Sequence, residues 1–175
     1  MEDNRGIFIW LIGFILVITW VISLNGYNDA PARIPLHFDW DGTPNRWGEK
    51  TPFNFFLAPL ISTALCALMI FLTRFPKLFN FPQKEQIKNW PDAAKKPVYD
   101  LLIKMMLVLA FIMSLMFLFI QVQVIESAKS HRLTGGDMWP MWILVAGILA
   151  VPIYYLVKIS RLVNELQQKI TVAGR

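Results

Sequence analysis

Residues 7–24 read Ile7-Phe-Ile-Trp-Leu-Ile-Gly-Phe-Ile-Leu-Val-Ile-Thr-Trp-Val-Ile-Ser-Leu24 and contain no Asp, Glu, Lys or Arg. Three further windows, 53–72, 105–124 and 138–157, are equally free of these four residue types. The chain's 17 basic and 12 acidic residues therefore lie between and beside these windows. Each helix of a soluble protein needs a polar face toward water, so this segregation of charge excludes a soluble enzyme.

The composition of the whole chain points the same way. Hydrophobic residues make up 55% of the 175 residues and charged residues 17%, against roughly 25% charged in an average soluble domain. This content of apolar residues excludes an intrinsically disordered chain. The single cysteine, Cys66, excludes a module held together by several disulfides.

The four windows match the thickness of a lipid bilayer. Each spans 18 to 20 residues, close to the length of about 20 apolar residues that an α-helix needs to cross the hydrocarbon core. Backbone groups in lipid must be paired within their own segment, which favours helices. We therefore predict an all-α, four-helix integral membrane protein, with residues 1–175 as one membrane domain. A cleaved signal peptide at 7–24 is disfavoured by the length of the apolar run and its weak positive flank.

The distribution of Lys and Arg predicts the orientation. Twelve of these residues flank the windows on the side of the two termini, and five lie in 25–52 and 125–137. The positive-inside rule then places both termini in the cytoplasm and 25–52 and 125–137 outside, in a multi-pass membrane protein. The net charge of +5 and pI near 9.5 indicate a basic inner face against lipid headgroups, with no nucleic acid as partner.

The windows hold only mild polar groups. Without an ionisable side chain at membrane depth, a proton relay or charge-coupled transporter has no evident machinery. Small side chains recur every four residues at Ala58, Ser62 and Cys66. This stripe predicts close helix packing inside the bundle, with an oligomer face as the alternative. Gln121 and Gln123, near the outer end of their helix, are expected to meet water at the headgroups.

The 25–52 segment is predicted to form a structured cap. Its run from Leu36 to Asp41 alternates apolar and polar residues, which places His37, Asp39 and Asp41 on one face of an extended segment. Leu36, Phe38 and Trp40 would share the other face, against the top of the bundle or the headgroups. The sequence Asp41-Gly42-Thr43-Pro44 then predicts a turn.

Ten residues of this segment carry a family resemblance: Pro31, Ile34, Pro35, His37, Phe38, Gly42, Pro44, Trp47, Gly48 and Lys50. Placed between a first and a second membrane helix, this motif resembles a bacterial domain of unknown function. That domain also forms the N-terminal part of the immunity proteins for the sporulation-delaying toxin (SdpI-type). The resemblance covers about residues 7–75. It implies a multi-pass protein of the bacterial cytoplasmic (inner) membrane that protects against a peptide.

The chemistry of the cap has three open readings. His37, Asp39 and Asp41, with Glu49 nearby, offer imidazole and carboxylate ligands for a divalent metal. Alternatively, these side chains hold the cap together. They would form hydrogen bonds with the loop backbone and ion pairs with the basic residues Arg33, Arg46 and Lys50. Catalysis is disfavoured because the loop holds no second His or Cys. We expect no catalytic residue, no bound metal and no cofactor.

Twelve residues of the cap are expected either to bind a ligand or to hold the loop together: Pro31, Ile34, Pro35, His37, Phe38, Asp39, Asp41, Gly42, Pro44, Trp47, Gly48 and Lys50.

Two other segments are predicted to face the cytoplasm. Residues 158–170 place Ile159, Leu162, Val163, Leu166 and Ile170 at helical spacing, which predicts an amphipathic extension of the fourth helix. This extension either docks a partner or packs on the membrane surface or a neighbouring loop. Residues 74–100 interleave aromatic and basic residues, a pattern expected to lie along the headgroup boundary.

These observations predict a non-enzymatic bacterial membrane protein that senses, or protects against, a peptide or envelope ligand through its outer loop. One alternative is an accessory structural subunit of a larger membrane complex. A second alternative is a metal-binding membrane protein or an enzyme that uses the outer-loop His and Asp residues. The expected partners are the lipid bilayer and either another membrane protein or a peptide ligand.

Overall fold

The computed structural model describes residues 5–130 and 138–173. Four of its helices are long and apolar enough to cross a membrane, which confirms the prediction of four membrane-length helices. They are α1 (Arg5–Asp29), α2 (Pro52–Leu72), α3 (Asp92–Ser130) and α4 (Trp139–Ala173). The described chain also contains two short strands, β1 (Arg33–Phe38) and β2 (Pro44–Glu49), and a 3₁₀ turn, η1 (Pro76–Leu78).

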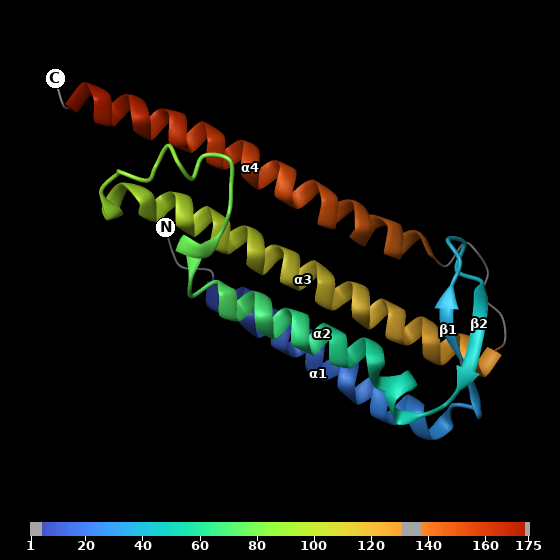
Figure 1. The fold of residues 1–175 in the computed structure, drawn as a ribbon. Helices are drawn as coiled ribbons and strands as arrows, with labels where there is room; N and C mark the ends of the chain where they lie inside the picture. The colour runs from blue at the N-terminus through green and yellow to red at the C-terminus, as the bar shows by residue number, and fades with distance from the viewer. Residues whose placement is uncertain (1–4, 131–137, 174–175) are drawn as a thin grey trace.

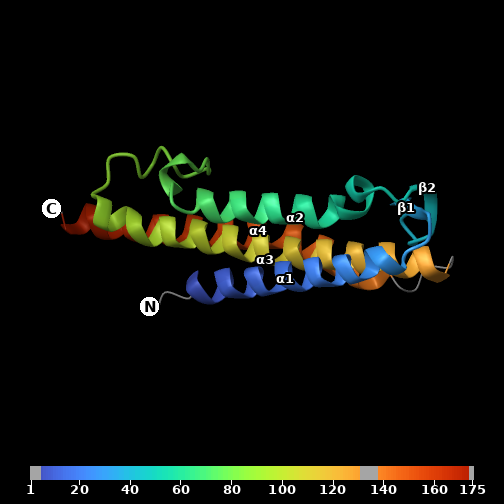
Figure 2. The same ribbon diagram turned by 90° about the horizontal axis from the view of Figure 1, so that it is seen from below.

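Successive helices run antiparallel, so both ends of the chain lie at the same end of the bundle (Figure 1). We call this the terminal end. The strands lie at the opposite end, which we call the hairpin end. Helix α3 contacts each of the other three helices, and it runs between α1 and α2 in the view of Figure 2. The fold is thus organised around its longest helix.

The helices extend beyond the uncharged windows. Helix α3 begins at Asp92, well before the window 105–124. Helix α4 continues through the predicted extension 158–170 to Ala173. The expected start of α3 was too late because absence of charge marks only the part of a helix that lies in lipid. Backbone hydrogen bonding continues into charged sequence, so a helix need not end where the apolar run ends.

The all-α assignment needs correction at the hairpin end. Strands β1 and β2 pair antiparallel, with Arg33 opposite Glu49 and Ile34 opposite Gly48. The predicted extended segment therefore finds a partner in the same loop. Pairing satisfies backbone groups that a single extended segment would leave open, which is the physical reason for the two strands.

The core is divided into three clusters along the bundle. At the hairpin end, Ile34 of β1 and Phe55 of α2 pack with Ile125 of α3. In the middle, Ile12, Cys66 and Ala110 bring α1, α2 and α3 together. A third cluster at the terminal end joins α3 and α4 to the segment between α2 and α3. Its buried members are Phe81, Ile87, Trp90, Val98, Leu101, Leu102, Ile159 and Val163.

This third cluster changes the interpretation of 74–100. Phe81, Ile87 and Trp90 are buried against α3 and α4, and do not simply lie along the headgroups as expected. Trp90 Nε1 also donates a 3.0 Å hydrogen bond to Gln167 Oε1 of α4. The extension of α4 therefore packs on a neighbouring segment of the same chain, because its apolar stripe is covered there.

Two glutamine side chains that were expected at the headgroup boundary are buried inside the bundle. Gln121 is fully buried and Gln123 is 6% exposed, so the expectation that both meet headgroup water was wrong. Gln121 Nε2 lies 3.4 Å from the carbonyl oxygen of Phe55 in α2. Residues two apart point to different sides of a helix, so α3 is covered on more than one side near this end, which the local sequence did not reveal.

Candidate functional site

The cap between α1 and α2 is a β-hairpin whose pairing is irregular near its tip. Pro35 lies opposite Trp47 and His37 opposite Arg46, with register shifts between Pro35 and Phe38. Such bulges bend a strand and change the direction of its side chains. The regular alternation predicted from Leu36 onward is therefore broken within the second half of β1.

A tight turn joins the two strands. The backbone N–H of Asp39 donates to the carbonyl of Thr43 at 2.8 Å, and that of Gly42 donates to the carbonyl of Asp39 at 2.9 Å. Asp41 Oδ1 accepts the backbone N–H of Thr43 at 3.0 Å. The carboxylate of Asp41 thus holds the turn from inside, a common role of Asp in loops.

Gly42 is required at this turn for two reasons. Its φ of +88° lies in the left-handed region that other residues rarely adopt. A Cβ added at this position would also overlap the side chain of Met138, just before α4. The turn therefore lies directly against the start of α4, a contact that only a residue without a side chain permits.

The exposed side of the hairpin carries a short chain of polar side chains. Asn45 Nδ2 donates to Asp39 Oδ1 at 2.5 Å, and Asn45 Oδ1 lies 2.7 Å from His37 Nδ1. Because an amide oxygen only accepts, this contact is a hydrogen bond when Nδ1 of His37 carries the proton. His37 of β1, Asn45 of β2 and Asp39 in the turn thus form one connected polar surface.

This geometry does not bring His37, Asp39 and Asp41 together as the metal-ligand set that was considered as one alternative. Asp41 bonds the turn backbone, whereas Asp39 is bound to Asn45. Among the described residues, no three His, Cys, Asp or Glu side chains come together in a group that could hold a metal ion. In the same part of the chain, Asp39 and Asp41 form no ion pair with a basic residue, and their carboxylates bond loop donors instead.

The tip also carries Trp40, which lies two residues after the end of β1 and is 79% exposed. Its expected neighbours on the apolar face behave differently. Leu36 packs against the cluster at the hairpin end, and Phe38 is half-buried. The alternation ends with the strand at Phe38, so Trp40 falls in the turn and points away from the protein core.

The base of the hairpin is fixed by burial. Ile34 is fully buried and packs with Phe55 of α2 and Ala128 of α3. Gly48 of β2 lies so close to Leu36 that a Cβ there would overlap the leucine side chain. The hairpin is therefore packed on three helices through its apolar face.

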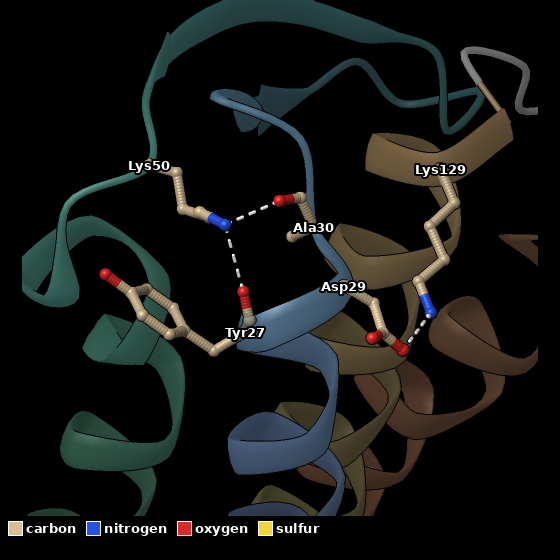
Figure 3. A network of polar contacts seen from close by, with 5 residues as sticks. All are labelled: Tyr27, Asp29, Ala30, Lys50 and Lys129. Carbon is tan, nitrogen blue, oxygen red and sulfur yellow. Dashed lines mark hydrogen bonds and ion pairs between the residues drawn. The ribbon is translucent and has the colours of Figure 1, made fainter.

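Lys50 fastens the hairpin to the end of α1 (Figure 3). Its Nζ donates to the carbonyl of Ala30 at 2.5 Å and to that of Tyr27 at 3.1 Å. The same ammonium lies 5.1 Å from the centroid of the Tyr27 ring. The final carbonyls of a helix lack partners within the helix and carry partial negative charge, so a lysine here serves as a cap. The expected ion pairs of Lys50 with the cap's acids are thus replaced by bonds to backbone carbonyls.

A second lysine acts nearby on the surface. Lys129 Nζ of α3 lies 3.2 Å from Asp29 Oδ2 at the end of α1 (Figure 3). These side chains are 46% and 67% exposed, so water screens their attraction. The buried cluster and Lys50 therefore contribute more than this ion pair to the position of the hairpin.

The second strand leads directly into α2. Thr51 is the N-cap of this helix, and its hydroxyl accepts the backbone N–H of Asn54 at 3.1 Å. Pro52 at the first helical position fits because its missing N–H would have no partner there. Asn54 Nδ2 in turn donates to the carbonyl of Glu49 at 2.9 Å.

The predicted cap residues divide by their exposure. Ile34, Pro35 and Gly42 are buried; Pro31, Phe38, Asp41, Pro44, Trp47, Gly48 and Lys50 are half-buried; His37 and Asp39 are exposed.

Sequence reasoning missed Asn45 and Trp40 as parts of the exposed surface. Asn45 would have been found by pairing the strands on either side of the predicted turn at Gly42, because this pairing brings Asn45 beside His37.

The predicted stripe of small side chains lies on α2, outside the hairpin. Ser62 and Cys66 are fully buried toward the bundle, with Cys66 Sγ donating to the carbonyl of Ala110 at 3.5 Å, whereas Ala58 is half-buried.

Comparison with known proteins adds two findings. Residues 14–63 match the model of a family described as "Domain of unknown function (DUF1648)". This range covers most of α1, the whole hairpin and the first half of α2. An uncharacterized protein of Archaeoglobus fulgidus is 26% identical over 156 residues, an alignment that covers 79% of this chain and 78% of the relative. No solved structure matches the chain.

Proposed function

We propose that this chain is a non-enzymatic membrane module whose hairpin binds a peptide or envelope ligand. The observation that carries the proposal is the contrast within the hairpin. Its base is buried on three helices, whereas the tip presents the indole of Trp40, 79% exposed. A large apolar side chain held out on a fixed scaffold is typical of a recognition surface.

The tip offers polar as well as apolar contacts. The connected side chains of His37, Asn45 and Asp39 are exposed, and Asp39 directly precedes Trp40 in the turn. An exposed aromatic anchor beside oriented hydrogen-bonding groups suits a peptide, which presents both side chains and backbone amides. The family resemblance to immunity proteins makes membrane-active peptides the first ligand class to test.

The proposed orientation places the hairpin outside a bacterial cytoplasmic membrane and both termini in the cytoplasm. The count along the sequence supports it, with twelve Lys and Arg residues on the side of the termini against five in 25–52 and 125–137. The common position of the two termini in the fold is compatible with this arrangement.

Labelling of single cysteines tests the orientation. In a Cys66→Ser background, Thr43→Cys places a thiol at the exposed turn, and Lys88→Cys places one at the exposed terminal end. We expect a membrane-impermeant maleimide to label position 43 in intact cells and position 88 only after permeabilisation. Labelling of both positions in permeabilised cells is the control. The opposite pattern in intact cells would reverse the proposed topology.

Sensitivity to peptides tests the function. We expect deletion of the gene to raise the sensitivity of cells to one or more members of a panel of synthetic amphipathic cationic peptides. Wild-type protein should restore resistance and Trp40→Ala should not, because truncation of a central aromatic anchor weakens binding by roughly 30-fold or more. Trp10→Ala is the matched control, since Trp10 is 82% exposed but lies near the start of α1, away from the hairpin.

The expression of both variants in the membrane is measured alongside. Unchanged sensitivity of the deletion strain would remove the proposal, and equal loss of resistance in Trp40→Ala and Trp10→Ala would remove the role of the hairpin.

A second candidate function is supported by α4. Only 6% of its membrane window is buried inside the chain, and Trp142, Ile143 and Leu149 are each more than half exposed. A helix with so little cover within its own chain is suited to pack against another membrane protein, as in an accessory subunit. This candidate would remain if deletion of the gene left peptide sensitivity unchanged.

A further inference from the structure

A large cavity lies at the terminal end, far from the hairpin. It has a volume of about 690 Å³ and is lined by side chains from the start of α1, the first turns of α3 and the second half of α4. Three helices that are distant in sequence therefore contribute to one concave site. A cavity of this size can hold a small ligand or the headgroup of a lipid.

The lining of the cavity is strongly basic. On α3, Lys96 and Lys104 lie on the same helix face, eight residues apart, with Asp100 between them. On α4, Lys158 and Arg161 face the same space. With Arg5 and Glu165, the lining holds five basic and two acidic side chains.

The acidic side chains do not balance these charges. Asp100 forms an ion pair with Arg5 of α1. Within the described residues, no ion pair involves Lys96, Lys104, Lys158 or Arg161. Like charges gathered around a partly enclosed space repel one another and attract an anion. The cavity is therefore electrostatically suited to a ligand with negative charge.

The depth of the cavity matches the edge of the hydrocarbon. Lys104 immediately precedes the uncharged window 105–124, and Lys158 immediately follows the window 138–157. Both lysines thus mark the same boundary on neighbouring helices. Apolar and aromatic side chains complete the lining there: Leu101, Tyr155 and Leu162. Along the two helices, Tyr155 lies on the lipid side of these lysines, whereas Leu101 and Leu162 lie among the cations on the water side.

The geometry points to a binding site for a phosphate-bearing anion, occupied by the headgroup of an acidic phospholipid. The cluster of cations would hold the phosphate, Leu101 and Leu162 would contact the glycerol, and Tyr155 would contact the first acyl carbons. Basic pockets between membrane helices are known to take such headgroups. Free phosphate shares the charge chemistry but lacks the apolar part, so the two sources can be separated by experiment.

The test uses the full chain purified in a neutral detergent, where no charged bilayer surface contributes. Phosphatidylglycerol, phosphatidylcholine and inorganic phosphate are added separately, and binding is followed by native mass spectrometry and by the thermal unfolding midpoint. The cavity variant is K96Q/K104Q/K158Q. The matched control is K77Q/K88Q/K169Q, which removes three exposed lysines that do not line the cavity.

We expect phosphatidylglycerol to bind and to raise the unfolding midpoint, and phosphatidylcholine to do neither. The cavity variant should bind roughly 100-fold more weakly, since each Lys or Arg contributes about fivefold toward an acidic lipid. The control should change less than about threefold. The variant K96R/K104R/K158R keeps the charge, so it should retain binding.

The experiment with inorganic phosphate shows whether the bound phosphate belongs to a lipid or to a soluble ligand. Stabilisation by inorganic phosphate at the same concentration as the lipid, lost in the cavity variant, would support the phosphate site and assign it to a soluble ligand. Equal weakening of lipid binding in the cavity variant and the control would overturn the site. Equal binding of phosphatidylglycerol and phosphatidylcholine would overturn it as well.

Discussion

Replacement of Lys50 by Met is expected to destabilise the protein by about 2–4 kcal/mol, since hydrogen bonds to charged groups contribute about 1.5–3 kcal/mol each. Methionine nearly keeps the length of the side chain but cannot donate to the carbonyls of Tyr27 and Ala30. Those carbonyls end α1, and their loss of a partner would also loosen the base of the hairpin. The measurement is the unfolding free energy in detergent, together with hydrogen exchange of the amides in 33–49.

Lys129→Met is the matched control for this prediction. It removes a lysine at the same end of the molecule, one whose partner Asp29 also lies at the end of α1. Because this ion pair is exposed, we expect a loss of less than about 1 kcal/mol and little change in hydrogen exchange of the hairpin. Similar destabilisation by the two substitutions would show that the bonds of Lys50 to the helix end have no special weight.

Replacement of Phe55 by Ala is expected to cost about 3–5 kcal/mol, the range for removal of a large buried aromatic side chain. Phe55 is 1% exposed and lies beneath the hairpin, with its ring 5.2 Å from that of Tyr27 and 5.4 Å from that of Phe56. The cavity left behind would lie among β1, α1 and α3. The measurement is the thermal unfolding midpoint, which we expect to fall by on the order of 10 °C.

Phe53→Ala supplies the comparison for Phe55. Phe53 belongs to the same turn of α2 but is 68% exposed, so its removal creates no internal cavity. We expect the unfolding midpoint of this variant to stay within about 2 °C of the wild type, as for surface substitutions away from specific contacts. A fall as large as that of Phe55→Ala would mean that burial under the hairpin is not what stabilises this region.

The four membrane helices were predictable because each window carries its own signal. Absence of charge over 18 to 20 residues is visible without any knowledge of neighbours. The ends of the helices were not predictable in this way. Helix α3 starts at Asp92, among Lys95, Lys96 and Pro97, where the sequence resembles a loop. Packing of Val98 and Leu101 against α4 and the preceding segment favours the helix there.

The hairpin was predicted only in part. The turn at Gly42 and the extended conformation around His37 were predicted from prolines, alternation and turn residues. The second strand was not, because Pro44-Asn-Arg-Trp-Gly-Glu49 shows no alternation of apolar and polar residues. Its backbone pairs with β1 without such a pattern, since the apolar face of the hairpin is supplied mainly by Ile34 and Leu36.

The exposed surface of the candidate site was also predicted only in part. His37 and Asp39 were expected to share a face, and Asn45 does connect them. Asp41 was expected on that face too, but it bonds the backbone of the turn instead. Alternation places residues correctly only while a strand continues, and β1 ends at Phe38.

The amino-acid sequence by itself determined four membrane-length helices and a turn at Gly42. The physical reason is that lipid requires each spanning segment to satisfy its own backbone, so each segment can be judged alone. Only the tertiary structure decided which groups meet across segments. The bonds of Lys50 to the end of α1, the burial of Gln121 against α2 and the basic cavity depend on the rotation and depth of each helix. The rotation and depth of a helix are set by packing between residues distant in sequence, so they cannot be predicted from a local sequence pattern.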